Sequence, residues 1–336
     1  MEFQQSTGHP HNSSSILCGE GPSLGDRSLV MASGGKDTAV TLAILKEAGQ
    51  EFNCLLLNPT PSARAIVEQA RCEAPIIVNR TIDPKLLDLN RTGYLNGHTP
   101  FSALLAVLGV SCALLFGYRR VIVSNERGAN EPNLKFLGES VNHQYSKSFR
   151  FEKVFQRYSQ SYLARNIDYF SLLRPLYEIQ VVYLFCRYPE YSGIFKSCNK
   201  NPNEGSWCLR CAKCLSTFII LYPFLQAEDV IRIFGRDIFE DKELIPLIHE
   251  LLRHKPFECV ATKGEIVVGL YLAQKDKTTL PVVLEYARRE ILPRYPQIHH
   301  LAKKVLSAWN TEHNLPKDYA HLLKRALNQF QKDSKL

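Results

Sequence analysis

The first half of the chain alternates short apolar runs with helical stretches, and this alternation restricts the fold more than any other feature of the sequence. The apolar runs occupy residues 28–32, 52–58, 75–79 and 119–125. The helical stretches between them occupy residues 37–48, 62–71 and 100–118. Strands that are single apolar runs separated by helices are typical of a parallel sheet with helices on both faces. The sequence therefore predicts a doubly wound α/β fold.

After about Glu152 the pattern becomes mostly helical, with a cysteine-rich interruption at residues 198–214. The 336 residues suffice for one large domain or two ordinary ones. The first residues lack the basic start and apolar core of a secretory signal and read as a disordered polar lead-in. We expect four parts: the lead-in over 1–27, an α/β domain over 28–150, a mostly helical region over 151–275 and C-terminal helices over 276–336.

Charge and cysteine content restrict the partners and the compartment. The formal net charge of +8 favours an anionic partner, and the lack of any run of five or six like charges favours a small molecule over nucleic acid. Ten cysteines without an export signal favour reduced thiols or a metal, and hence the cytoplasm. Residues 100–118 are uncharged but near the lower length limit for a membrane span, so we expect a helix buried against the sheet.

The stretch "ASGGKDTAVT" follows the first apolar run and has the features of a phosphate-binding turn. Glycines let the backbone approach an anion, and the helix that follows directs its first amides at it. Lys36 can pair with phosphate oxygens, Thr38 offers a hydroxyl, and Asp37 is placed to hold Mg²⁺. The alternative is an ordinary glycine turn between strand and helix. The predicted nucleotide-binding residues are Ser33, Gly34, Gly35, Lys36, Asp37 and Thr38.

These residues closely resemble the SGGxDS signature of the PP-loop ATP pyrophosphatases, with Thr38 in place of serine. The resemblance implies a sheet of the PP-loop, HUP-like type. It also implies cleavage of ATP between the α and β phosphates, with AMP left on a substrate oxygen and diphosphate released.

Four later cysteines form a C-x9-C-x2-C-x2-C pattern. Four thiolates make a closed tetrahedral site that suits a structural zinc ion; unliganded thiols and an iron–sulfur cluster are the alternatives. The predicted ligands are Cys198, Cys208, Cys211 and Cys214. The remaining cysteines are scattered and read as small buried apolar residues: Cys18, Cys54, Cys72, Cys112, Cys186 and Cys259.

A PP-loop followed by such cysteines resembles the 7-cyano-7-deazaguanine synthases, which adenylate a carboxylate and carry a four-cysteine zinc site. Their last three cysteines usually read C-G-x-C-x-x-C, whereas Leu209 stands here at the glycine position.

A second resemblance covers roughly residues 29–272 and rests on several segments in a specific order. They are "GHTPFSALLA", "SNERGANEPN", "VNHQYSKSFRFE", "YFSLLRPLYEIQ", "WCLRCAKC" and "KPFECV". Together they resemble the UDP-N-acetyl-α-D-muramoyl-L-alanyl-L-glutamate epimerases, ATP-dependent enzymes of peptidoglycan precursor synthesis and cell-wall biogenesis. The resemblance implies inversion of the terminal L-glutamate of a UDP-sugar dipeptide. In that family a further domain precedes the phosphate loop, so we expect a shortened or divergent member, or a partner that supplies that domain. The helices after Thr278 have no family role that we can assign.

Activation of the α-carboxyl as an acyl-adenylate would remove its charge and let an enolate form after a base takes the α-proton. Catalytic candidates are Glu126, which follows the fourth run, and His143 and Lys147 in "VNHQYSKSFRFE". Substrate-binding candidates are Asn125, Asn130, Glu131, Asn142 and Arg174. Glu126, Asn130 and Glu131 are candidates for holding Mg²⁺ or the glutamate end. For the loop residues the alternative is an ordinary polar turn, and for Arg174 it is a buried ion pair.

Two other functions fit parts of the sequence. A PP-loop enzyme that modifies another carboxylate or a nucleobase, for example in tRNA, would be expected to show a basic stripe with interleaved aromatics, which the chain lacks. A non-catalytic nucleotide-binding module would have little need of Lys36, Asp37 and Thr38 together.

Overall fold

The computed structural model describes residues 2–5, 25–95, 99–201, 206–275 and 277–333. Its strands are β1 (Glu2–Gln5), β2 (Gly25–Met31), β3 (Phe52–Leu57), β4 (Ile76–Asn79), β5 (Tyr118–Val123), β6 (Leu134–Phe136), β7 (Glu139–Val141) and β8 (Asp168–Ser171). Its α-helices are α1 (Lys36–Glu47), α2 (Pro61–Gln69), α3 (Pro84–Arg91), α4 (Phe101–Phe116), α5 (Phe149–Tyr158), α6 (Glu178–Cys186), α7 (Ala212–Leu221), α8 (Ala227–Phe234), α9 (Ile245–Arg253), α10 (Lys263–Gln274), α11 (Val282–Tyr286), α12 (Ile298–Leu306) and α13 (Lys317–Asp333).

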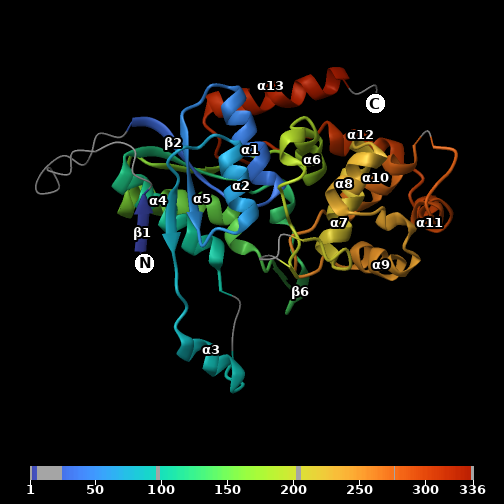
Figure 1. Ribbon diagram of the computed structural model, residues 1–336, viewed down its shortest axis with the longest axis horizontal. Coiled ribbons are helices and arrows are strands. Elements are labelled where there is room, and N and C mark those ends of the chain that lie inside the picture. The colour runs from blue at the N-terminus through green and yellow to red at the C-terminus, as the bar shows by residue number, and fades with distance from the viewer. Residues whose placement is uncertain (1, 6–24, 96–98, 202–205, 276, 334–336) are drawn as a thin grey trace, which may run out of the picture.

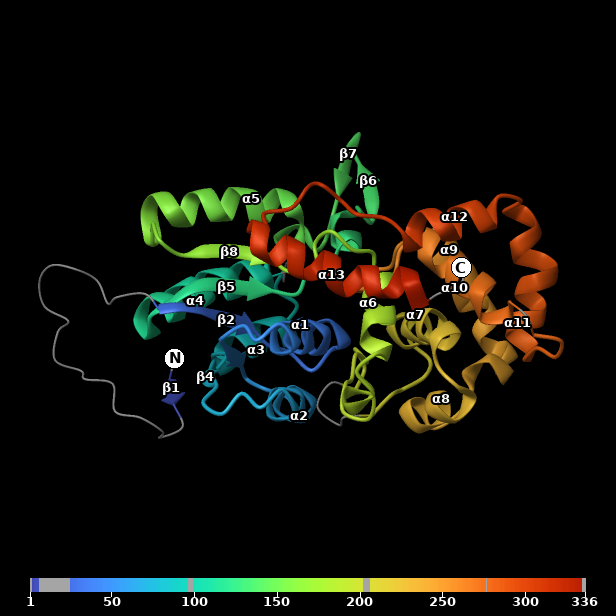
Figure 2. The same cartoon turned by 90° about the horizontal axis from the view of Figure 1, so that it is seen from above.

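The main sheet has the strand order β1-β4-β3-β2-β5-β8 (Figure 2). Its last five strands are parallel, and β1 adds to β4 in the antiparallel direction. The chain moves outward from β2 to β4 and then returns to the other side of β2 with β5 and β8. The direction therefore reverses between β2 and β5, where Val30 lies beside Ile122. Such a switch point is the usual place for a ligand in an open parallel sheet.

Alternate residues of the strands face two separate cores, as the two-residue period of a strand requires. Val30 and Ile122 pack with α1, α2 and α13, whereas Leu29 and Val121 pack with α4 and α5. Gly109 lets α4 approach closely, because a Cβ there would lie 2.8 Å from a methyl carbon of Val121. The expected α/β fold with a parallel sheet is confirmed. Helix α4 packs against the sheet as predicted, but only through one face, because Val107, Leu114 and Leu115 are exposed.

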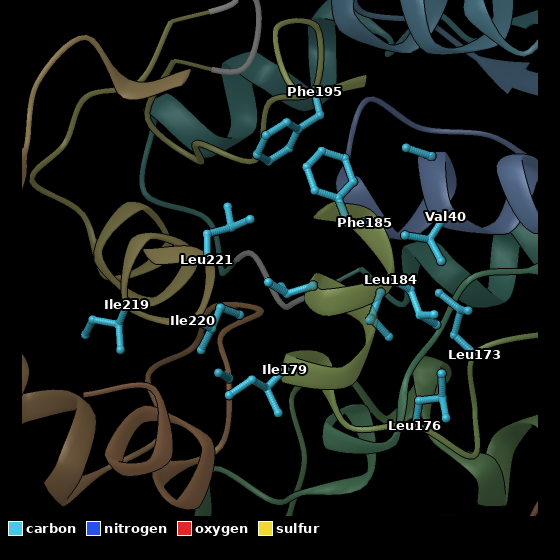
Figure 3. Packing of buried hydrophobic residues seen from close by; sticks show 14 of the residues in the cluster. Val40, Leu173, Leu176, Ile179, Leu184, Phe185, Phe195, Ile219, Ile220 and Leu221 are labelled. Atoms are coloured by element: carbon cyan, nitrogen blue, oxygen red, sulfur yellow. The ribbon is translucent and has the colours of Figure 1, made fainter. Parts of the chain in front are cut away.

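Helix α6 joins the sheet to the helical second half of the chain. Its residues Leu184 and Phe185 lie between Val40 of α1 and Leu221 of α7 in Figure 3. Phe185 also meets Phe195 edge to face, with ring centroids 4.6 Å apart. Because α6 is buried on both sides, the start of this helix is held firmly between the two halves.

Five elements differ from the sequence-based expectation: β1, β6, β7, β8 and α3. The lead-in expected to be disordered over 1–27 contains β1 and the start of β2, while residues 6–24 lie outside the described residues. Strand β8 lies in the region expected to be mostly helical, because Tyr169 and Phe170 are buried on opposite faces beside β5. The hairpin β6–β7 was not predicted. Helix α3 buries no residue and projects from the body (Figure 1).

The C-terminal helices also have a structural role. Tyr319 of α13 shares a hydrogen bond of 2.8 Å with Ser28 of β2, so the last helix covers the sheet. Within the described residues, no helix is both long and apolar enough to cross a membrane.

Candidate nucleotide-binding and active site

The predicted phosphate loop connects β2 to α1 at the switch point. Ser33 and Thr38 close the turn, with their hydroxyl oxygens 2.9 Å apart. Gly34 is required for packing, because a Cβ there would lie 2.1 Å from the Ser62 hydroxyl oxygen. Gly35 precedes the first turn of α1 and has no capping side chain. The first amides of a helix are free of partners within the helix, so this turn has the geometry of an anion site.

Lys36 lies beneath this turn in a buried ion-pair network. Its ammonium is 2.8 Å from Asp37 and 2.7 Å from Glu178, the first residue of α6. Burial alone would lower the pKa of Lys36, but the two carboxylates outweigh it and raise the pKa. Lys213 of α7 lies 3.5 Å from the same Glu178 oxygen. Burial opposes ionisation of Glu178, yet Lys213 and Lys36 together lower its pKa to about 2. Lys36 and Glu178 are therefore both charged at neutral pH.

Two further acids, Glu126 and Glu265, interact electrostatically with this network. Burial, followed by the carboxylates of Glu178 and Glu265, raises the pKa of Glu126 to about 8. Burial and then Glu178 likewise raise the pKa of Glu265 to about 7. Glu265 accepts a hydrogen bond of 2.9 Å from the amide of Thr262 and has a clear role in capping α10. Glu126 accepts from the amide of Gly128. It follows β5 directly, so the loop after β5 brings an acid with a raised pKa to the switch point.

Two predicted substrate-binding amides hold the loop after β5 in shape. Asn130 accepts a hydrogen bond of 2.7 Å from the Phe149 amide. Asn142 donates to the Ala129 carbonyl at 2.8 Å and accepts from the Gln144 amide at 2.8 Å. These contacts favour a positioning role for both side chains over direct substrate binding.

The remaining two loop candidates differ in exposure. Asn125 donates to the Ser171 hydroxyl at 3.3 Å and is half-buried at the end of β5. Glu131 is exposed. Of the two, Glu131 is therefore the side chain that a ligand reaches more easily.

Arg174 is fully buried and forms an ion pair with Glu152, with Nη2 3.0 Å from a carboxylate oxygen. The same guanidinium donates to the carbonyls of Glu126 at 3.0 Å and Lys147 at 2.7 Å, and to the Ser171 hydroxyl at 3.1 Å. Of the two readings of Arg174, the geometry favours the buried ion pair over a clamp on a substrate carboxylate. Arg174 acts on the site by joining the two segments that carry Glu126 and Lys147.

His143 and Lys147 line a cavity of about 240 Å³. The Nδ1 atom of His143 is 2.6 Å from the side-chain oxygen of Asn133, and its ring meets Phe257 edge to face. The ammonium of Lys147 lies 3.1 Å from the sulfur of Cys259. The two candidates thus belong to one cavity.

The four predicted metal ligands gather in one place. Their sulfurs all lie within 4.8 Å of one another, and Cys208 and Cys214 are 3.7 Å apart. Ligands about 2.3 Å from a tetrahedral zinc ion would be about 3.8 Å apart, so this cluster fits zinc. Leu209 has a φ of +58°, a conformation that favours glycine.

The cysteine segment also contacts the phosphate loop. The amide of Lys196 donates to the Gly34 carbonyl at 2.8 Å. Lys213, between two of the cysteines, reaches Glu178 as described above. The cluster is therefore tied to the loop both through the backbone and through the buried ion pairs.

Family comparisons agree with this arrangement. The MurL N-terminal domain matches residues 3–172, and the MurL C-terminal domain matches residues 194–299. This chain belongs to the MurL family.

Three curated relatives are each named UDP-N-acetyl-alpha-D-muramoyl-L-alanyl-L-glutamate epimerase. The Micromonospora protein is 36% identical over 88% of this chain and 68% of its own length. The Xanthomonas oryzae protein is 35% identical over the same shares, and the Salinispora tropica protein is 37% identical over 74% of this chain and 56% of its own length. The matched regions thus cover between 56% and 68% of these relatives.

For this MurL-family chain, sequence reasoning missed Glu178, Lys213 and Glu265. It read Cys259 as a small buried residue, whereas Cys259 is half-buried and lines the cavity. Glu178 lies in "YFSLLRPLYEIQ" and Cys259 in "KPFECV", two segments that carry the family resemblance. A carboxylate inside an otherwise apolar segment was the signal available for Glu178. Cys259 carried no signal beyond its place in the motif.

Proposed function

We propose that this chain inverts the terminal L-glutamyl centre of UDP-N-acetylmuramoyl-L-alanyl-L-glutamate in an ATP-dependent reaction of peptidoglycan precursor synthesis. The observation that carries the proposal is the phosphate loop at the switch point beside the Glu126 loop, in a chain similar to three epimerases. The sheet and loop fit the PP-loop, HUP-like type. Ten cysteines suit a reducing compartment, and we propose a cytoplasmic location.

The first step would use the phosphate loop. The amides at the start of α1 and the buried charge of Lys36 would hold the phosphates of ATP, and Asp37 would hold Mg²⁺. The substrate α-carboxylate would attack the α-phosphate, forming an acyl-adenylate and releasing diphosphate. Since Lys36 is already paired with two carboxylates, its role would be to position the turn and supply positive potential from below.

The second step would take place on the activated glutamyl group. Loss of the carboxylate charge lets a base remove the α-proton, with the electron pair moving to the carbonyl oxygen. Glu126, His143 and Lys147 are the candidates for proton transfer, and Asn125 and Glu131 for substrate contact. The raised pKa of Glu126, about 8, suits a carboxylic acid that donates a proton at neutral pH. Reprotonation on the opposite face and hydrolysis would give the D-glutamyl product and AMP.

The cysteine cluster would hold a structural zinc ion through Cys198, Cys208, Cys211 and Cys214. Four thiolates leave no open position for water, so the metal would stabilise the segment and take no part in catalysis. Its contacts through Lys196 and Lys213 would fix the phosphate loop. We also propose a partner protein that supplies a counterpart of the part of these relatives that lies outside the matched regions.

The function is tested by incubating the protein with ATP, Mg²⁺ and the UDP-muramoyl dipeptide in D2O. The proposal predicts AMP release together with deuterium at the glutamyl α-carbon. AMP release without deuterium would instead favour a PP-loop enzyme acting on another carboxylate. If neither appears, the epimerase proposal for this chain is wrong.

A further inference from the structure

Cys259 lies in a different environment from Cys54 and Cys112. Its thiol donates a hydrogen bond of 3.0 Å to the side-chain oxygen of Gln144, and the Lys147 ammonium is 3.1 Å from its sulfur. It is half-buried and lines the cavity of about 240 Å³ together with His143. By contrast, Cys54 and Cys112 are buried in the two cores of the sheet.

The surrounding structure holds this sulfur from two sides. The neighbouring Glu258 accepts hydrogen bonds from Asn199 at 3.0 Å and from the Lys213 amide at 3.2 Å. On the other side, Lys147 is the last residue of a short 3₁₀ helix, η2 (Tyr145–Lys147). The carbonyl of Lys147 accepts a hydrogen bond from the buried Arg174. The thiol and the ammonium therefore meet between two anchored segments.

The cavity is also connected to the phosphate loop. Asn199, one of its lining residues, lies three positions after Lys196, whose amide binds Gly34. A Cβ on Gly35 would lie 3.6 Å from the hydroxyl of Ser197. The phosphate loop and the cavity thus share the segment 196–199, whose first residue binds Gly34 and whose last residue lines the cavity.

Reactive cysteines act as thiolates and lie partly exposed beside cationic groups. Cys259 is half-buried and lies beside the Lys147 ammonium. A thiol has an ordinary pKa near 8.5, and general acid–base catalysis is most effective when the pKa of the group lies near the working pH. The arrangement of cation, thiol and cavity is thus suited to proton transfer at carbon.

We propose that Cys259 exchanges the α-proton of the activated glutamyl group on one face, with Lys147 stabilising its thiolate. This inference rests on the proposed epimerase function. As the C–H bond breaks, the proton forms the S–H bond and the electron pair moves to the carbonyl oxygen of the acyl-adenylate. A second acid, for which Glu126 is the candidate, gives a proton to the opposite face. Exchange with water then returns both groups to their starting states.

The test uses Cys259→Ser with either the L-glutamyl or the D-glutamyl substrate in D2O, with ATP and Mg²⁺. The variant should release AMP from both substrates. Inversion should fall about 100-fold or more. Deuterium should enter only one of the two epimers, without inversion, because the base on the other face remains. The matched control is Cys72→Ser, a half-buried cysteine that likewise donates to a side-chain amide oxygen, that of Asn53.

Several outcomes decide the proposal. Equal losses of exchange from both epimers would indicate a structural role and overturn it, as would inversion by the variant at the wild-type rate. Lys147→Met should reduce inversion, and Lys147→Arg, which keeps the cation, should restore part of it; equal rates for these two variants would also contradict the proposal. If the wild-type protein shows no deuterium exchange, the epimerase function itself fails, which is a different result.

Discussion

Two regions joined by the segment 196–199 are built in opposite ways. Beneath the phosphate loop, the side chains of Lys36 and Glu178 are 2% and 4% exposed and bind each other. In the second region, the cavity of about 240 Å³, the side chains of His143, Lys147 and Cys259 are only half-buried. The first region holds charges that are fully paired within the protein. The second presents ionisable groups at a cavity.

This difference assigns a role to each region. Paired buried charges are costly to disturb and keep a turn in one conformation, which suits repeated binding of the same nucleotide. Partly exposed groups can gain and lose protons during a reaction. We therefore expect changes in the first region to affect stability most, and changes in the second to affect proton exchange most.

Removal of the metal is expected to have the largest effect on the first region. We expect one zinc ion per chain, and chelation should lower the free energy of unfolding by more than about 5 kcal/mol. Nucleotide binding should weaken in parallel, because Lys196 and Lys213 connect the cysteine segment to the loop. Metal analysis and urea denaturation test this. If the protein contains no zinc and unfolds identically with and without chelator, the cysteine cluster does not stabilise the phosphate loop through a bound metal.

Glu178→Gln should have the next largest effect. The change leaves two buried ammonium groups without their shared carboxylate, which typically costs about 3–5 kcal/mol of the free energy of unfolding. Glu243→Gln is the matched control, because Glu243 pairs with Arg210 at the exposed surface. Similar denaturation curves for the two variants would mean that the buried network does not hold the loop.

Arg174→Met tests how the segments that carry Glu126 and Lys147 are held in place. It should cost about 3 kcal/mol of the free energy of unfolding, because Glu152 is left buried without its partner. The double variant with Glu152→Met should recover most of that stability but not the rate of inversion, since Arg174 also holds the Glu126 and Lys147 carbonyls. Recovery of both would reduce Arg174 to a packing role.

The pH dependence of stability should show the smallest effect. The raised pKa values of Glu126, about 8, and Glu265, about 7, mean that the folded protein binds these protons more tightly than the unfolded chain. Their contribution is present below the ordinary glutamate pKa and is lost as pH rises from about 5 to about 8. The lowered pKa of Glu178 works in the opposite direction, and its contribution is lost as pH falls from about 5 to about 2.

Glu126→Gln tests the first of these windows. It should flatten part of the loss of stability between about pH 5 and pH 8, measured by urea denaturation at each pH. The exposed Glu68→Gln is the control and should leave the slope unchanged. An unchanged slope in Glu126→Gln would mean that Glu126 is already ionised at low pH.

The parts of the fold that could be predicted are those determined by local patterns. The apolar runs at β2, β3, β4 and β5 and the glycine turn before α1 are visible in short stretches of sequence, and the parallel order then places Ser33 near Asn125. Strand β8 was missed because four residues are too few to show a period. Strand β1 was missed because it pairs with β4 across a long separation in the chain.

The site was predicted only in part for the same reason. Lys36, Glu126, His143 and Lys147 lie in motifs that can be read locally. The partners of these residues could not be predicted locally. Glu178 reaches Lys36, and Lys213 reaches Glu178, only after the second half of the chain folds against the first. Arg174 looked equally suited to a substrate carboxylate until its contact with Glu152 was known.

The central claim is that the phosphate loop activates the same glutamyl α-carboxylate whose α-proton is exchanged at the cavity. The most direct test is a turnover with substrate labelled with ¹⁸O in the α-carboxylate, in D2O, followed by mass spectrometry of AMP and product. We predict one ¹⁸O atom in AMP, deuterium at the inverted α-carbon, and no label in AMP when ¹⁸O is placed in the γ-carboxylate instead. Inverted, deuterated product accompanied by unlabelled AMP would contradict the account.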